Sequence, residues 1–75
     1  MLKQELNTLF TGMPQLVQDK LQPVLDNLLE RAGDLDDAGT DAADYDDERE
    51  AIMKEVHKVK YLNDQWQIMN ARKNN

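Results

Sequence analysis

The most chemically active feature of this sequence is a run of carboxylates in the middle of the chain. Residues 33–50 contain nine acidic side chains and a single basic one, Arg49, which gives this segment a net charge of −8. Because the whole 75-residue chain carries −6, its net charge arises in this segment. The nine acids are Asp34, Asp36, Asp37, Asp41, Asp44, Asp46, Asp47, Glu48 and Glu50. Such a run can bind a hard cation, imitate the phosphates of a nucleic acid, or keep a loop solvated.

A calcium site is one alternative for this segment. Starting at Asp34, the sequence D-L-D-D-A-G-T-D-A-A-D-Y resembles an EF-hand loop, with Asp34 at loop position 1, Asp36 at 3 and Gly39 at 6. It departs from that pattern at positions 5, 8 and 12, which are Ala38, Asp41 and Tyr45. A loop that lacks two of its ligands holds a hard cation poorly. A degenerate calcium-binding loop is therefore a remote alternative, and we predict no metal and no cofactor.

An anionic docking surface is the second alternative. Duplex DNA presents one charge per about 1.7 Å of its axis, and carboxylates at similar density can occupy the basic cleft of a nucleic-acid-binding protein. Small acidic inhibitors from phages and mobile elements, called DNA mimics, use this device, and the chain is similar to them in size and charge. The carboxylates predicted to bind the partner are Asp36, Asp37, Asp41, Asp44, Asp46, Asp47, Glu48 and Glu50. A solvated loop that caps the next helix is the third alternative.

The residue types needed for catalysis are scarce. The chain has no Cys and no Ser, and His57 is its one histidine, which excludes Ser-His and Cys-His nucleophiles and thiolate metal sites. Lys54 stands three residues before His57, so the Glu-x-x-His pair of a di-iron bundle is absent. There is also no Gly-rich phosphate loop. We predict a protein without enzymatic activity and without catalytic residues.

Two N-terminal helices must position the carboxylates from one side. Apolar residues recur at helical spacing from residue 2 onward, and Gly12 and Pro14 end one helix and begin the next. A second helix is predicted to reach Ala32 and to be kinked or divided at Pro23, which lies on its polar side. Gly33 is predicted to stop this helix. Residues 33–44 are predicted to form an acidic loop, because a single Leu cannot bury enough apolar surface to order them.

One long helix must position the carboxylates from the other side. Nothing breaks the pattern over residues 45–73, which corresponds to about 43 Å. Acids in its first turn, and Arg72 and Lys73 in its last, complement the helix dipole. An apolar stripe is predicted to face the first two helices. It consists of Tyr45, Ile52, Val56, Val59, Leu62, Trp66 and Met69.

A second stripe lies on the opposite side of the long helix. It contains Met53, His57, Tyr61 and Ile68, although a helix packed on one side should be polar there. Met53, Tyr61 and Ile68 are therefore predicted as apolar anchors for another chain, the alternative being isolated exposed residues. Residues 51–75 carry +3, and this basic end could pair with the acidic segment of a neighbouring copy in an antiparallel assembly.

Together these patterns predict a single all-α domain over residues 1–75, with two short helices in residues 1–32 packed on the long one. The hypothesis for function is a non-catalytic inhibitor or modulator that binds the basic surface of a nucleic-acid-handling protein, of phage or mobile-element origin. A homo-oligomeric structural or assembly factor is the alternative. The first ten residues do not resemble a signal peptide, and no stretch of 18 apolar residues occurs, so we expect a cytoplasmic protein without membrane or direct nucleic-acid binding.

Overall fold

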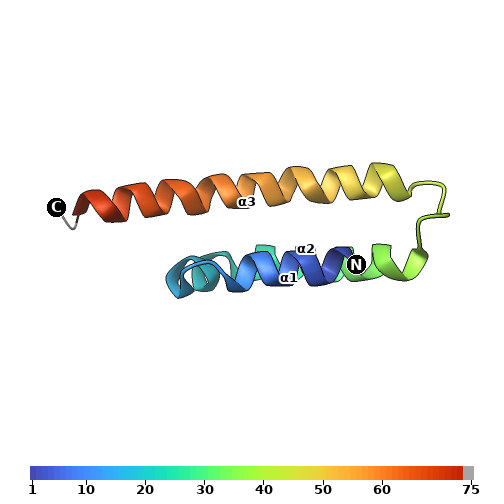
Figure 1. Cartoon of the computed structure of the whole chain (residues 1–75), viewed down its shortest axis with the longest axis horizontal. Helices are drawn as coiled ribbons and strands as arrows, with labels where there is room; N and C mark the ends of the chain where they lie inside the picture. Colours follow the sequence, from blue (N-terminus) through green and yellow to red (C-terminus); the bar gives the residue numbers. More distant parts are fainter. Residues whose placement is uncertain (74–75) are drawn as a thin grey trace.

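Three helices account for the architecture of the described part of the chain. The computed structural model describes the backbone of residues 1–73 and the side chains of residues 1–71, and it contains no strand within those bounds. Helix α1 spans Leu2–Thr11, α2 spans Gln15–Ala38 and α3 spans Tyr45–Lys73. Helix α2 packs against both of the others (Figure 1). The molecule is therefore a rod, with extents of 51 × 17 × 17 Å.

The turn between α1 and α2 forms where Gly12 and Pro14 predict it. The Gly12 N–H donates to the Thr8 carbonyl at 3.3 Å, which closes the last turn of α1. Pro14 then occupies the N-cap position of α2 with φ of −55°, the value to which its ring restricts it. The Gln18 side chain donates to the Met13 carbonyl at 2.7 Å, so a backbone acceptor left free by the turn is satisfied.

Helix α2 is longer than predicted, and the predicted loop over residues 33–44 is wrong in its first half. The helix continues to Ala38 and ends at Gly39, whose φ of +82° suits a residue without a side chain. Leu35 explains the extension, because it is only 5% exposed and adds one more turn to the core. Gly33 lies inside the helix and does not stop it. The connection to α3 is thus residues 39–44 only.

Pro23 does not divide α2. The helix is continuous from Gln15 to Ala38, so the alternative of two separate helices is wrong. Pro23 is exposed, as its predicted place on the polar side requires. A proline there leaves one backbone carbonyl without a helical partner, and water can reach it on an exposed face. The kink itself stays a prediction.

The core lies along the seam where α2 meets its two neighbours. Leu28, Ile52 and Val56 are the largest fully buried side chains, and burying one such side chain contributes about 1.5–3 kcal/mol. All the buried residues among those described are apolar. They are Leu2, Leu6, Phe10, Met13, Val17, Leu25, Leu28, Ala32, Leu35, Ile52, Val56 and Val59.

Helix α3 has the predicted bounds, but only its first half is covered. Its buried residues end at Val59, and Trp66 still packs against the core. Leu62 and Met69 border α2 residues in shallow hollows, as their place in the predicted stripe requires, but they are 51% and 62% exposed and are not buried. The last turns of α3 extend past the α1–α2 turn (Figure 1). The predicted pairing of Arg72 and Lys73 with the helix C-terminus concerns side chains outside the described ones.

Candidate functional site

The α2–α3 connection forms one end of the rod and positions most of the carboxylates. We call residues 34–50 the acidic end. The connection is held by backbone hydrogen bonds, from the Ala42 N–H to the Gly39 carbonyl at 3.2 Å and from the Tyr45 N–H to the Ala42 carbonyl at 3.1 Å. The Tyr45 side chain packs against the core. The carboxylates are therefore attached to two helices and a short, hydrogen-bonded turn.

Asp36 has a structural role that the sequence pattern did not reveal. Its Oδ1 accepts a hydrogen bond from the Leu2 N–H and its Oδ2 accepts one from the Lys3 N–H, both at 3.0 Å. These amides belong to the first turn of α1, where backbone donors have no helical partner and the helix dipole favours a negative charge. The side chain of Met1, at the N-cap position, does not cap the helix. Asp36 thus caps α1 from 34 residues away.

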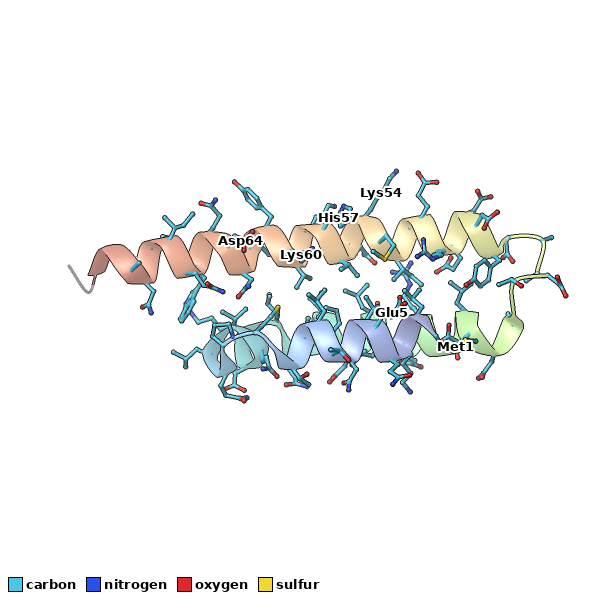
Figure 2. All side chains as sticks on the ribbon, viewed as in Figure 1. Met1, Glu5, Lys54, His57, Lys60 and Asp64 are labelled. Carbon is cyan, nitrogen blue, oxygen red and sulfur yellow. The ribbon has the colours of Figure 1, made fainter. Side chains whose placement is uncertain are left out.

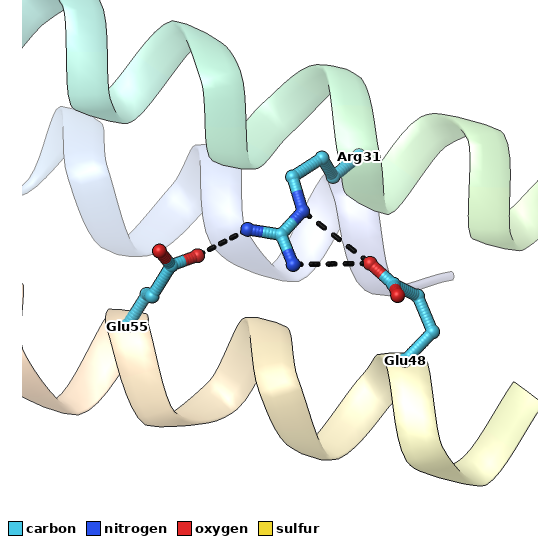
Figure 3. A network of polar contacts seen from close by, with 3 residues as sticks. All are labelled: Arg31, Glu48 and Glu55. Carbon is cyan, nitrogen blue, oxygen red and sulfur yellow. Dashed lines mark hydrogen bonds and ion pairs between the residues drawn. The ribbon is translucent and has the colours of Figure 1, made fainter.

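Glu48 is likewise occupied within the molecule. Its Oε1 accepts hydrogen bonds from Nε and Nη2 of Arg31, at 3.3 and 3.0 Å, and Nη1 of Arg31 pairs with Glu55 (Figure 3). The hydrogen bonds that Arg31 donates to Glu48 are the main cause that raises the pKa of Arg31, against the lowering effect of burial. Arg31 therefore stays charged and joins α2 to two successive turns of α3.

The other predicted acids at this end are free to meet a partner. They are all exposed, and no hydrogen bond or ion pair joins their side chains to other described side chains. Figure 2 shows oxygen-bearing side chains projecting outward around the α2–α3 connection. The exposed set is Asp37, Asp41, Asp44, Asp46, Asp47 and Glu50, to which the structure adds Asp34. Of the eight predicted carboxylates, six thus remain available.

The second half of α3 carries an apolar surface that the sequence analysis found only in part. Tyr61 and Ile68 are 62% and 50% exposed, as their selection as anchors requires. Leu62 and Met69 are similarly exposed, and they lie about 100° around the helix from Tyr61 and Ile68. We call these four residues the apolar flank. Met53 is not part of it, because that side chain is partly buried against the core.

Two shallow hollows accompany the apolar flank. One is lined by His57, Lys58, Tyr61 and Leu62, and almost all of its surface is apolar. The other lies between α2 and α3 and is lined by Val17, Lys20, Leu21, Leu62 and Trp66. Tyr61 and Ile68 are exposed because they lie on the side of α3 opposite its buried residues, whereas Leu62 borders α2 at the edge of the packed region.

The acidic end does not have the geometry of an EF-hand loop. Asp34 and Ala38, the first and fifth positions of the proposed loop, lie on α2, and Asp36 caps α1. An EF-hand needs these positions to turn around a cation. Among the described residues, no group of three or more His, Cys, Asp or Glu side chains could hold a metal ion.

Comparisons with known protein families, with curated proteins and with solved structures find no match to this chain. Function must therefore be argued from the two surfaces alone. Within the described residues, no helix combines the length and the hydrophobicity that a membrane crossing demands.

Proposed function

We propose that this chain is a small non-catalytic protein that binds another protein through its acidic end, as an inhibitor or modulator of a nucleic-acid-handling enzyme. The observation that carries the proposal is the set of six predicted carboxylates that are exposed and not paired among the described side chains. Exposed carboxylates concentrated at one end of a rod attract a basic cleft and orient the approach to it.

The spacing of these carboxylates supports a surface that competes with nucleic acid. Asp46, Asp47 and Glu50 fall within the first two turns of α3, where each residue rises about 1.5 Å. This corresponds to about one free carboxylate per 2.5 Å of helix, compared with one charge per about 1.7 Å of duplex DNA. The positive end of the α3 dipole makes this arrangement of negative charges less costly.

A homo-oligomeric helical unit is the second candidate function, and the apolar flank favours it. Four large apolar side chains are exposed within about three turns of the helix, and Tyr61 and Leu62 line a common hollow. Under this candidate, Tyr61→Asp with Ile68→Asp disperses the assembly. Under the first candidate, the same double variant binds its target as before.

The test of the proposed function uses proteins that already bind DNA. The chain is immobilised and exposed to the DNA-cellulose-binding fraction of a cell lysate, and retained proteins are eluted with duplex DNA or with salt. We expect retention at low ionic strength, release by duplex DNA, and steep loss of binding between about 50 and 200 mM salt. Binding that duplex DNA and salt leave unchanged would contradict the proposal.

A matched pair of variants assigns this binding to the acidic end. Asp44→Asn, Asp46→Asn and Asp47→Asn together remove three charges there, and Asp19→Asn, Asp26→Asn and Glu30→Gln remove three exposed charges from α2. We expect the first triple variant to lose most of its retained protein and the second to keep it. Equal loss of retained protein in both variants would mean that binding depends on the net charge of the chain and not on the acidic end.

A further inference from the structure

Helices α2 and α3 leave one side of their seam open. Helix α1 packs on α2 from the other side. Figure 3 views the pair from the uncovered side, with α1 behind the other two helices. There Arg31 of α2 pairs with Glu48 and Glu55 of α3, which closes the half of the seam next to the acidic end. We call this side of the α2–α3 pair, away from α1, the open side.

Toward the α1–α2 turn the open side becomes an apolar groove. Two hollows between α2 and α3 adjoin there, and both are lined by Lys20 and Trp66. Exposed apolar side chains form the rims of the groove, one turn to either side of Lys20 on α2 and along α3. Their exposed fractions lie between 45% and 62%, which makes the groove an apolar surface shared by two helices. The rim residues are Leu16, Val24, Leu62 and Met69.

Lys20 has a position on α2 like that of Arg31, but it meets no carboxylate. The two residues are eleven positions apart, or about three helical turns, and therefore point in nearly the same direction from α2. Arg31 finds two glutamates on α3, whereas Lys20 finds Leu62 and Met69 in the hollows. Among the described side chains, no acid pairs with Lys20. The groove thus lacks the carboxylates that the other half of the open side has.

The groove is basic, although the chain as a whole is acidic. Lys58 stands one turn before Leu62 and lines a hollow with it, so two lysines flank this rim residue. The acids of α2 near Lys20 are Asp19 and Asp26, and each accepts a hydrogen bond from a glutamine of its own helix. The acidic end stops twelve positions before Leu62, or about 18 Å away along α3. This distance exceeds the Debye length of about 8 Å at physiological ionic strength, so the acidic end does not cancel the local positive charge.

We propose that this groove binds an acidic amphipathic helix of another protein, with apolar side chains in the hollows and carboxylates on Lys20 and Lys58. Helix α1 shows the kind of segment that suits these helices, since its buried residues recur at every fourth position. The groove extends over eleven positions of α3, from Lys58 to Met69, or about 17 Å, which a helix of about 11 residues covers. It lies apart from the acidic end, so the inference goes beyond the proposed function.

Charge complementarity selects an acidic partner over a second copy of the chain. In a twofold pair the same surface meets itself, so Lys20 and Lys58 of both copies would be brought together without a carboxylate between them. A foreign helix with Glu or Asp beside its apolar face supplies the missing carboxylates, as two glutamates of α3 do for Arg31. An apolar stripe between two helices is also the form of groove into which an amphipathic helix docks.

The first test uses the fluorescence of Trp66, which is the one tryptophan of the chain and lines both hollows. The probe is a synthetic helical peptide of about 12 residues, with three Leu on one face, Glu on both flanks of that face and Ala elsewhere. A matched peptide carries Gln in place of every Glu. We expect the Glu peptide to shift the emission of Trp66 to the blue with saturation below about 1 mM, and the Gln peptide to bind about tenfold more weakly.

Variants of the full chain then locate the charge pairing and the apolar contact. Lys20→Gln should weaken binding of the Glu peptide about fivefold and leave binding of the Gln peptide unchanged. Lys54→Gln is the control, since Lys54 projects from α3 away from the other two helices (Figure 2). Leu62→Gln should weaken both peptides about tenfold, whereas Ile68→Gln, at a site of matched exposure outside the groove, should weaken neither. Circular dichroism checks that every variant stays helical.

Four results would overturn the proposal. They are an emission of Trp66 that the Glu peptide leaves unchanged up to about 1 mM, equal affinities for the two peptides, equal effects of Lys20→Gln and Lys54→Gln, and a dimer in sedimentation that Leu62→Gln disperses. The last result would mean that a second copy occupies the groove. The triple Asn variant of the acidic end should bind the Glu peptide as the wild type does, so this test is independent of the proposed function.

Discussion

The two halves of α3 have the same helical geometry, but they place different kinds of residue in contact with α2. The first half pairs charged side chains with α2, and the second half leaves apolar side chains exposed to solvent. Positions 48, 55, 62 and 69 are seven residues apart and therefore share one azimuth of the helix. In the first half this position holds Glu48 and Glu55, and both are paired with Arg31 of α2. In the second half it holds Leu62 and Met69, which are mostly exposed. Charged residues are thus paired in the first half of α3, and apolar residues are exposed in the second half, where the packing against α2 ends.

This contrast shows that exposure along α3 is set by its neighbours more than by its own sequence. Val59 is 2% exposed and Leu62 is 51% exposed, although both belong to the stripe that is predicted to face the first two helices. The first half contributes to the stability of the monomer. Of the second half, Trp66 still packs against the core, and the exposed apolar residues around it contribute little to the stability of the monomer. Matched substitutions, one in each half of α3, can test this division.

The largest expected difference is between the two isoleucines. Ile52→Ala should lower the free energy of unfolding by about 2–5 kcal/mol, because it opens a cavity in a fully packed site. Ile68→Ala should change it by less than about 0.5 kcal/mol, as exposed substitutions usually do. Urea unfolding followed by circular dichroism measures both, at a chain concentration where sedimentation shows only monomer. Comparable losses for the two variants would mean that the second half of α3 is also packed within the monomer.

The next largest effect separates two neighbouring aspartates of the acidic end. Asp36→Ala should lower the free energy of unfolding by about 0.5–2 kcal/mol, since it removes both hydrogen bonds to the first turn of α1. Asp37→Ala removes the same charge from an exposed side chain and should have almost no effect. Thermal unfolding compares the two. Equal stabilities would show that the cap contributes nothing, and Asp36 would then be as available to a partner as Asp37.

The fold was predictable from sequence where the signal was local. Helical periodicity, Gly12 with Pro14, and the absence of any breaker after Tyr45 suffice for the three helices and for the bounds of α3. The end of α2 was not predictable in this way. The composition of residues 34–38 suggests a loop, but Leu35 gains a buried site and Asp36 gains two backbone donors only once α1 lies alongside. Propensity cannot anticipate contacts between residues 34 positions apart.

The candidate site was predictable to a similar extent. Charge density alone identifies the acidic end, and periodicity identifies Tyr61 and Ile68. The sequence pattern could not separate Asp36 and Glu48, which are occupied within the molecule, from the acids that are free. It also placed Leu62 and Met69 in the stripe that faces the first two helices, but these residues lie at the edge of that stripe, border α2 only in shallow hollows and stay mostly exposed.

The smallest expected effect concerns the ion pairs that hold the first half of α3. Arg31→Met keeps most of the apolar stem and removes the hydrogen bonds to Glu48 and Glu55. The side chain of Arg31 is 30% exposed and its partners more so, at 43% and 47%. Partly exposed pairs contribute little, so the loss should be about 0.5–1 kcal/mol and should shrink as salt is added. Lys54→Met, at an exposed site of α3, is the control for removing one positive charge. A loss of several kcal/mol that salt does not reduce would mean that Arg31 acts by packing, and the contrast between paired charges in one half of α3 and exposed apolar residues in the other would then not rest on electrostatics.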